Sequence, residues 1–182
     1  MEALSRAGFD IVHPFDARVV GLDGPPRGLI VGNTRALWAH FVDRSGEHPL
    51  ERYTEQIIGE AFPGAPIYYA HRTYNGAFLP MQRIAVAAGL GALAPSQLVI
   101  HPIYGPWFAL RAIVLVPGEP PAMQPIAKPC RCDGTCEAAF ARGDFLAARD
   151  ACSLRAWRYS QEQIDYHYAH LADFMTSSCP SE

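Results

Sequence analysis

Residues 99–118 read VIHPIYGPWFALRAIVLVPG. Pro102, Gly105 and Pro106 interrupt this apolar stretch, so it predicts a turn between a strand over 97–101 and a longer strand over 107–117. Side chains on a strand alternate between its two faces. Strict alternation gives one wholly apolar face, which we assign to the core: Phe108, Leu110, Ala112, Val114 and Val116.

The opposite face of the longer strand carries a charge. It places Trp107 and Arg111 about 13 Å apart at roughly 3.3 Å per residue. Burying a guanidinium without a partner costs several kcal/mol. We therefore expect Arg111 to meet either a carboxylate of the protein or an anionic group of a ligand.

Apolar and turn residues around this stretch predict the other elements. Asn33 and Thr34 form a helix N-cap ahead of an apolar stripe that ends near Gly46, and a second helix is expected over 48–62. The alanine-rich residues 80–93 lack a polar face in their second half, which predicts a helix that is covered on all sides. Further strands are expected over residues 9–15, 28–31 and 66–74.

Length and composition indicate one folded domain. The chain has 182 residues, of which 49% are apolar and 18% charged, too few for two ordinary domains. A net charge of -3 gives no attraction to nucleic acid or to an anionic membrane surface, so neither is an expected partner. There is no apolar run of about 18 residues and no signal-peptide pattern. A cytoplasmic location is therefore expected, as a monomer or a homodimer.

The C-terminal part combines a proline-rich connector, a cysteine cluster and a helix. We assign residues 1–118 to the core of the domain and 119–182 to this part of the same domain. Ser160 and Gln163 form a capping box ahead of the final helix. Four thiolates can hold zinc or a [4Fe–4S] cluster, although no pair here has the usual Cys-x2-Cys spacing. Zinc, an iron–sulfur cluster and reduced or redox-active thiols all stay open for Cys130, Cys132, Cys136 and Cys152. The nearby Asp144, Arg149 and Asp150 are expected to be ordinary solvated charges.

The string over 101–118 resembles the central signature of the cobalamin-processing family of the methylmalonic aciduria and homocystinuria type C protein. That signature reads His-Pro, a variable residue, an aromatic residue, Gly-Gly, Trp-Phe-Ala-Ile-Arg, and then a Val/Leu-rich strand closed by Pro-Gly. Pro106 stands here in place of the second glycine. Weaker similarities lie at residues 8–15 and 158–163, in the same order. The matching positions are His101, Pro102, Tyr104, Gly105, Trp107, Phe108, Ala109, Arg111, Pro117 and Gly118.

This resemblance implies a fold and an activity. The fold would be α+β, with a nitroreductase-like mixed β-sheet flanked by helices. The core over 1–118 would bind cobalamin with its lower base detached from cobalt. Loss of that nitrogen ligand makes Co(III) easier to reduce, so reduced FMN or FAD, or another electron donor, could drive removal of the upper axial ligand. Decyanation is the expected reaction, with dealkylation as an open alternative. The glutathione-binding region of dealkylating family members is shortened or absent here.

The resemblance also implies roles for single residues. His101 would lie beside the displaced base as a neutral imidazole, Gly105 would permit close approach of the ring, and Trp107 would form a flat wall. Tyr159 would close the cavity from the C-terminal helix, although a hydrophobic staple beside the capping box explains it equally well. The residues expected to contact the corrinoid are His101, Pro102, Tyr104, Gly105, Pro106, Trp107, Phe108, Arg111, Tyr159 and Gln163.

Two other functions fit the same sequence. A non-catalytic corrinoid chaperone would use the same pocket without any reductant. The cysteine cluster departs from the type C pattern and is similar to a degenerate form of the iron–sulfur segment of epoxyqueuosine reductases and reductive dehalogenases. An iron–sulfur redox protein is therefore the second alternative, in which electrons would not need a flavin.

Overall fold

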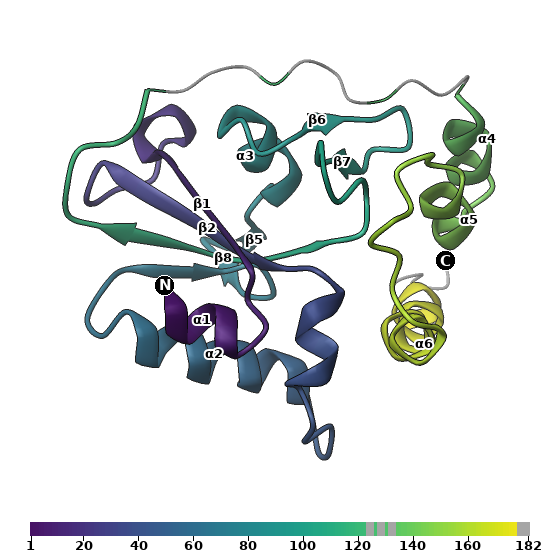
Figure 1. Cartoon of the computed structure of the whole chain (residues 1–182), viewed down its shortest axis with the longest axis horizontal. Helices are drawn as coiled ribbons and strands as arrows, with labels where there is room; N and C mark the ends of the chain where they lie inside the picture. The colour runs from purple at the N-terminus through teal and green to yellow at the C-terminus, as the bar shows by residue number, and fades with distance from the viewer. Residues whose placement is uncertain (123–125, 127–129, 131–133, 178–182) are drawn as a thin grey trace.

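A four-stranded sheet lies at the centre of the molecule (Figure 1). The computed structural model of the chain describes residues 1–122, 126, 130 and 134–177, with side chains as far as residue 169. Neighbouring strands of the described sheet are all antiparallel. The strand order is β1 (Ile11–Asp16), β2 (Arg27–Asn33), β8 (Ala109–Val116) and β3 (Ile67–Tyr69).

The predicted α+β class is confirmed, and so are the strands expected over 9–15, 28–31 and 107–117. The sheet differs from the mixed one that was expected, because all its described strand pairs are antiparallel. A short connection that returns the chain in the opposite direction gives such a pair. The turn between β1 and β2 is an example, since it contains only the 3-10 helix η1 (Ala17–Val20) and a short loop.

Helices cover both faces of this sheet, as Figure 1 shows. The helices α1 (Glu2–Arg6) and α2 (Pro49–Ala61) lie on one face, and α3 (Met81–Ala87) lies on the other. The first face buries Leu29, Val31, Ala112 and Val114 in one apolar cluster with Leu4, Phe9, Leu50 and Ile58. The second face buries Ile30, Ile113 and Leu115 with Ile84 and Ala85. The helix predicted over 48–62 is thus confirmed as α2.

The prediction of a helix covered on all sides over 80–93 is wrong. Only the side of α3 that packs on the sheet is buried, and Gln82, Arg83 and Val86 on the other side are exposed. Gly89, with φ +72, follows the end of the helix. The end of the predicted range is the strand β6 (Ala92–Leu93), which forms a small hairpin with β7 (Val99–Ile100).

A β-bulge at Arg111 interrupts the long strand β8. Val31 on β2 pairs with Ala112, whereas the next residue, Gly32, pairs with Leu110, so Arg111 has no partner in this ladder. An extra residue reverses the alternation of side chains beyond it. Ile113 and Leu115 therefore pack in the same cluster as Phe108 and Leu110, while Ala112 and Val114 pack on the α2 face. The predicted assignment of faces is wrong beyond the bulge, and both faces are core.

The helix predicted after Thr34 is capped as expected but is short. The Thr34 hydroxyl accepts a hydrogen bond from the Ala36 N–H at 3.2 Å, ahead of the 3-10 helix η2 (Arg35–Ala39). The stretch beyond it cannot continue as a helix because side chains take its backbone groups. Arg44 Nε donates to the Phe41 carbonyl, and the Ser45 N–H donates to the Asp43 carboxylate.

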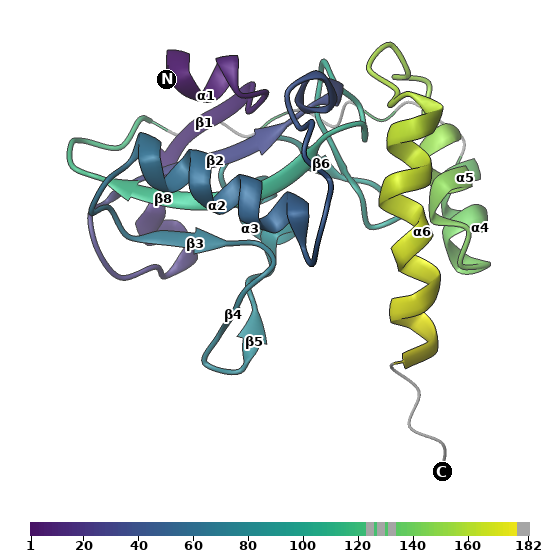
Figure 2. The same ribbon diagram turned by 90° about the horizontal axis from the view of Figure 1, so that it is seen from below.

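Three helices of the C-terminal part lie beside one end of the sheet (Figure 2). They are α4 (Thr135–Ala141), α5 (Phe145–Asp150) and α6 (Gln161–Ser177). The capping box is half formed, because the Ser160 hydroxyl accepts from the Gln163 N–H at 3.2 Å but the Gln163 amide makes no return bond. Glu162 accepts hydrogen bonds from Trp38 Nε1 and from Arg44, which fastens α6 to the main body.

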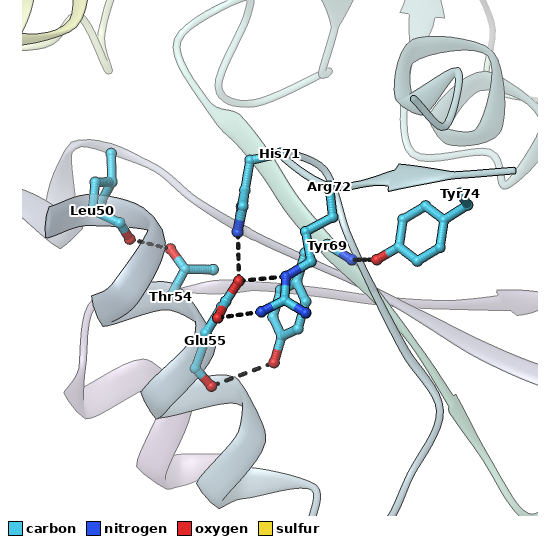
Figure 3. A network of polar contacts seen from close by, with 7 residues as sticks. All are labelled: Leu50, Thr54, Glu55, Tyr69, His71, Arg72 and Tyr74. Atoms are coloured by element: carbon cyan, nitrogen blue, oxygen red, sulfur yellow. Dashed lines mark hydrogen bonds and ion pairs between the residues drawn. The ribbon is translucent and has the colours of Figure 1, made fainter. Parts of the chain in front are cut away.

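A second hairpin, β4 (Thr73–Tyr74) and β5 (Ala77–Phe78), projects from the sheet next to β3 (Figure 2). Its base is tied to α2 by a polar network around Glu55, shown in Figure 3. The Glu55 carboxylate accepts hydrogen bonds from Nε and Nη2 of Arg72, each at 2.7 Å, and contacts His71 Nε2 at 2.8 Å. None of the described helices is both long enough and apolar enough to cross a bilayer.

Candidate functional site

His101 holds the turn between β7 and β8. Its backbone N–H and carbonyl both pair with Gly105, at 2.9 Å each. Its ring Nδ1 accepts hydrogen bonds from the backbone N–H groups of Ile103 (3.1 Å) and Tyr104 (3.3 Å). A ring nitrogen that accepts carries no proton, so the neutral imidazole holds its proton on Nε2 and is a donor there. The Tyr104 ring stacks on this imidazole, with centroids 4.4 Å apart.

The charge of His101 follows from its surroundings. Burial lowers the pKa of the imidazole to about 4, and the nearby His13 adds to the shift. The ring is therefore neutral near pH 7.

Gly105 is required by its contact with the C-terminal part. It has φ +60 and lies so close to Leu154 that an added Cβ would be 2.3 Å from the Leu154 carbonyl oxygen. The close approach that requires glycine here is thus made by the protein backbone. Tyr104 also meets Trp157 edge-on at 4.9 Å. The turn is thus seated on residues 154–157, while Pro102 at its tip is exposed.

A cavity of about 320 Å³ opens beside this turn, and we name it the Phe108 cavity. Two residues of the matched string, Pro106 and Phe108, form part of its wall. Phe108 also meets the His101 ring edge-on at 6.0 Å, which places the imidazole just behind that wall. The remaining lining residues are Ala70, Leu79, Met81, Gln82, Leu98, Val99, Leu110 and Arg149.

A second cavity, of about 630 Å³, lies on the α2 side of β8, and we name it the Arg111 cavity. Arg111 reaches it from the bulge, Glu51 from α2, and Tyr166 and His167 from α6. Arg111 Nε donates to the Asn33 side-chain oxygen at 2.7 Å, while its Nη2 is out of solvent and has no described partner. Burial lowers the pKa of Arg111. Of the two partners expected for Arg111, no described carboxylate is within ion-pair distance, so an anionic ligand group stays open.

Trp107 does not line either cavity in the described part of the chain. It is fully buried and packs in one cluster with Tyr159 and Ile164, with the Tyr159 ring edge-on at 5.5 Å. Several polar atoms in this region are buried without a described hydrogen-bond partner, an arrangement that is uncommon in native proteins. They are Trp107 Nε1, Arg111 Nη2, Arg149 Nε, the Tyr159 hydroxyl, both amide atoms of Gln163, and His167 Nε2. The set marks the boundary between the sheet and α6 as a polar interior.

Sequence reasoning missed two residues of this site. Arg149, expected to be a solvated charge, is partly buried, lines the Phe108 cavity and donates to the Phe108 carbonyl at 3.0 Å. His167 lies four residues after Gln163, hence on the same side of α6. That spacing was the only local sign of its position. Burial lowers the pKa of His167 to about 3, with the positive charges of Arg111 and Arg149 adding to the shift.

The cysteine cluster is only partly described. Cys136 and Cys152 are buried and Cys130 is partly exposed, whereas Cys132 lies outside the described residues. Among the described residues, no group of three or more His, Cys, Asp or Glu side chains is arranged to hold a metal ion. The zinc, iron–sulfur and thiol alternatives for the cluster stay predictions.

Comparisons with known proteins bear on the fold. No family model matches the chain, and no curated protein matches its sequence. The structure is similar to that of a B12-trafficking protein CblC from C. elegans, a human MMACHC homologue, with a TM-score of 0.58 and 18% identity over 91% of this chain and 87% of that chain. An epoxyqueuosine reductase from Streptococcus thermophilus matches with a TM-score of 0.49 and 11% identity over 86% of this chain and 55% of that one. The sequence resemblance to the type C family is thus confirmed at the level of the fold. The chain has the α+β fold of that CblC protein.

Proposed function

We propose that the chain binds a cobalamin-type corrinoid, with its lower base detached from cobalt, where β8 meets the C-terminal helices. The observation that carries this proposal is the position of the matched string. Its Pro106 and Phe108 border one cavity, and its Arg111 borders the other. The similar fold of a B12-trafficking protein supports the same function.

The two cavities divide the corrinoid between them in this proposal. Neither has to enclose the whole molecule, since the two cavities, of about 320 and 630 Å³, would each take a different part of it. His101 suits the tail side, because a base that has left cobalt has a free nitrogen lone pair and His101 Nε2 is a neutral donor. Arg111 and His167 suit the other side, where the upper ligand leaves.

The proposed reaction is reductive removal of the upper ligand. One electron from a reduced flavin converts Co(III) to Co(II), and cyanide leaves as the anion with the bonding electron pair. The detached base favours this step, because loss of an axial nitrogen donor makes Co(III) easier to reduce. The protein would contribute the geometry: it would hold the base away from cobalt, and Arg111, whose Nη2 has no described partner, would stabilise the departing anion.

Visible spectroscopy tests this proposal. Adding the protein to cyanocobalamin should shift the spectrum to the base-off form, and reduced flavin should then yield Co(II). His101→Ala should raise the protein concentration that is required for the base-off shift about tenfold or more. His40→Ala, which removes an exposed imidazole elsewhere, is the matched control and should leave it unchanged. No shift at protein well above micromolar would overturn the proposal. A base-off shift without reduction of cobalt would indicate a non-catalytic corrinoid chaperone.

A further inference from the structure

Among the described residues, Arg149 is the one cation that lines the Phe108 cavity, and no described carboxylate pairs with it. The other residues that line this cavity are apolar apart from Gln82. Arg149 Nη2 donates to the Phe108 carbonyl at 3.0 Å, but its Nε is buried and has no described partner. The nearby carboxylate of Asp150 is already paired with Arg158 at 2.6 Å. A cation in apolar surroundings without a carboxylate is expected to meet an anion of a ligand.

The Arg149 guanidinium is also held in one place. It lies over the Trp107 ring at 5.3 Å and over the Tyr159 ring at 5.4 Å. The bond to the Phe108 carbonyl fixes it from a third direction. A guanidinium that is already oriented loses little freedom on binding, and its planar fork matches a phosphate oxygen pair.

Resting on the proposed function, we propose that Arg149 binds the phosphodiester of the nucleotide tail of cobalamin. The cavity of about 320 Å³ is too small for a whole corrinoid but is on the scale of a nucleotide. Its apolar walls suit the flat base, and its one cation suits the phosphate. The wall residue Phe108 touches the His101 ring, the residue proposed to meet the detached base. Arg149 therefore makes the site selective for complete cobalamins over corrinoids that lack the tail.

The test compares two ligands with three variants. Cobalamin and cobinamide share the corrin ring, but cobinamide lacks the nucleotide tail and its phosphodiester. Affinity of the full chain for each ligand is measured by isothermal titration calorimetry, because cobinamide has no lower base and so gives no base-off shift. Arg149→Gln should lower the affinity for cobalamin about tenfold or more and leave cobinamide unchanged, whereas Arg149→Lys, which keeps the charge, should lose less. Arg142→Gln makes the same charge change at an exposed arginine between α4 and α5 and should change neither.

Each outcome decides between the hypotheses. Retained cobinamide binding in Arg149→Gln shows that the variant is folded, so a selective loss of cobalamin supports the phosphate contact. An equal loss for both ligands, or no loss for either, overturns it while leaving corrinoid binding intact. If the unaltered chain binds neither corrinoid, the proposed function itself fails.

Discussion

A single side-chain oxygen, that of Asn33, decides how Arg111 is held. Asn33 is fully buried, accepts from Arg111 Nε and donates its amide to the Thr34 carbonyl at 2.8 Å. Thr34 in turn donates its N–H to Asp10 at 2.7 Å. This chain of contacts runs from the first loop to the bulge and keeps the guanidinium turned toward the Arg111 cavity.

Asn33→Ala tests this contact. The change leaves Arg111 without its described acceptor, and a buried donor left unpaired costs about 2–3 kcal/mol when it is charged. We expect the free energy of unfolding in urea to fall by that amount. Gln56→Ala removes an exposed amide on α2 and should change it by less than about 0.5 kcal/mol. Equal effects from the two variants would show that Asn33 is not a significant partner.

The sequence predicted only some of the residues that form the candidate site. The matched string pointed to His101, Phe108 and Arg111, because their spacing is local. Asn33 and Arg149 reach the site from far along the chain, and nothing beside them in the sequence marks that. Arg149 looks like any charge on a short helix until the Phe108 carbonyl is placed next to it.

At the scale of elements, local patterns predicted what local forces set. The Thr34 and Ser160 caps and the helix over 48–62 depend on neighbouring residues and were predicted correctly. The prediction of which side chains lie on which face of β8 was wrong beyond Arg111. A bulge depends on pairing with β2, and the sequence pattern of alternating side chains does not indicate it. The helix predicted after Thr34 stops early for a similar reason, since the side chains of Arg44 and Asp43 bind backbone groups of the residues that follow η2.

The turn between β7 and β8 gives an element-scale prediction. Gly105→Ala would introduce a Cβ 2.3 Å from the Leu154 carbonyl oxygen at a residue with positive φ. We therefore expect the free energy of unfolding, measured by thermal unfolding, to fall by about 3 kcal/mol or more. Gly143→Ala is the matched control, because Gly143 also has positive φ but open space around it. It should cost only about 1–2 kcal/mol. Similar decreases in the free energy of unfolding for both variants would mean that the positive φ alone, and not the close contact with Leu154, requires glycine at position 105.

For the whole molecule, stability should depend on pH through two neutral histidines. Burial lowers the pKa of His101 to about 4 and that of His167 to about 3, whereas both titrate near 6.5 in the unfolded chain. Below pH 6.5 the unfolded chain therefore takes up protons that the folded chain does not, and stability is lost as the pH falls. Stability from these groups is fully present above pH 6.5.

Urea unfolding at pH 7 and pH 5 measures this effect. We expect the free energy of unfolding to fall by roughly 1 kcal/mol for each histidine, after allowing for the solvent that still reaches these half-buried rings. The double variant His101→Gln, His167→Gln should show a flatter dependence over the same interval. An unfolding free energy that does not change between pH 7 and pH 5 in the unaltered chain would contradict the lowered pKa values.

The bulge at Arg111 has a mechanical consequence. Leu110 faces the Phe108 cavity and the next residue, Arg111, faces the Arg111 cavity, so one peptide unit serves as the partition between them. Consecutive Cα atoms are about 3.8 Å apart, and a planar peptide unit moves as a rigid plate. A tilt of that plate would therefore change the walls of both compartments at the same time.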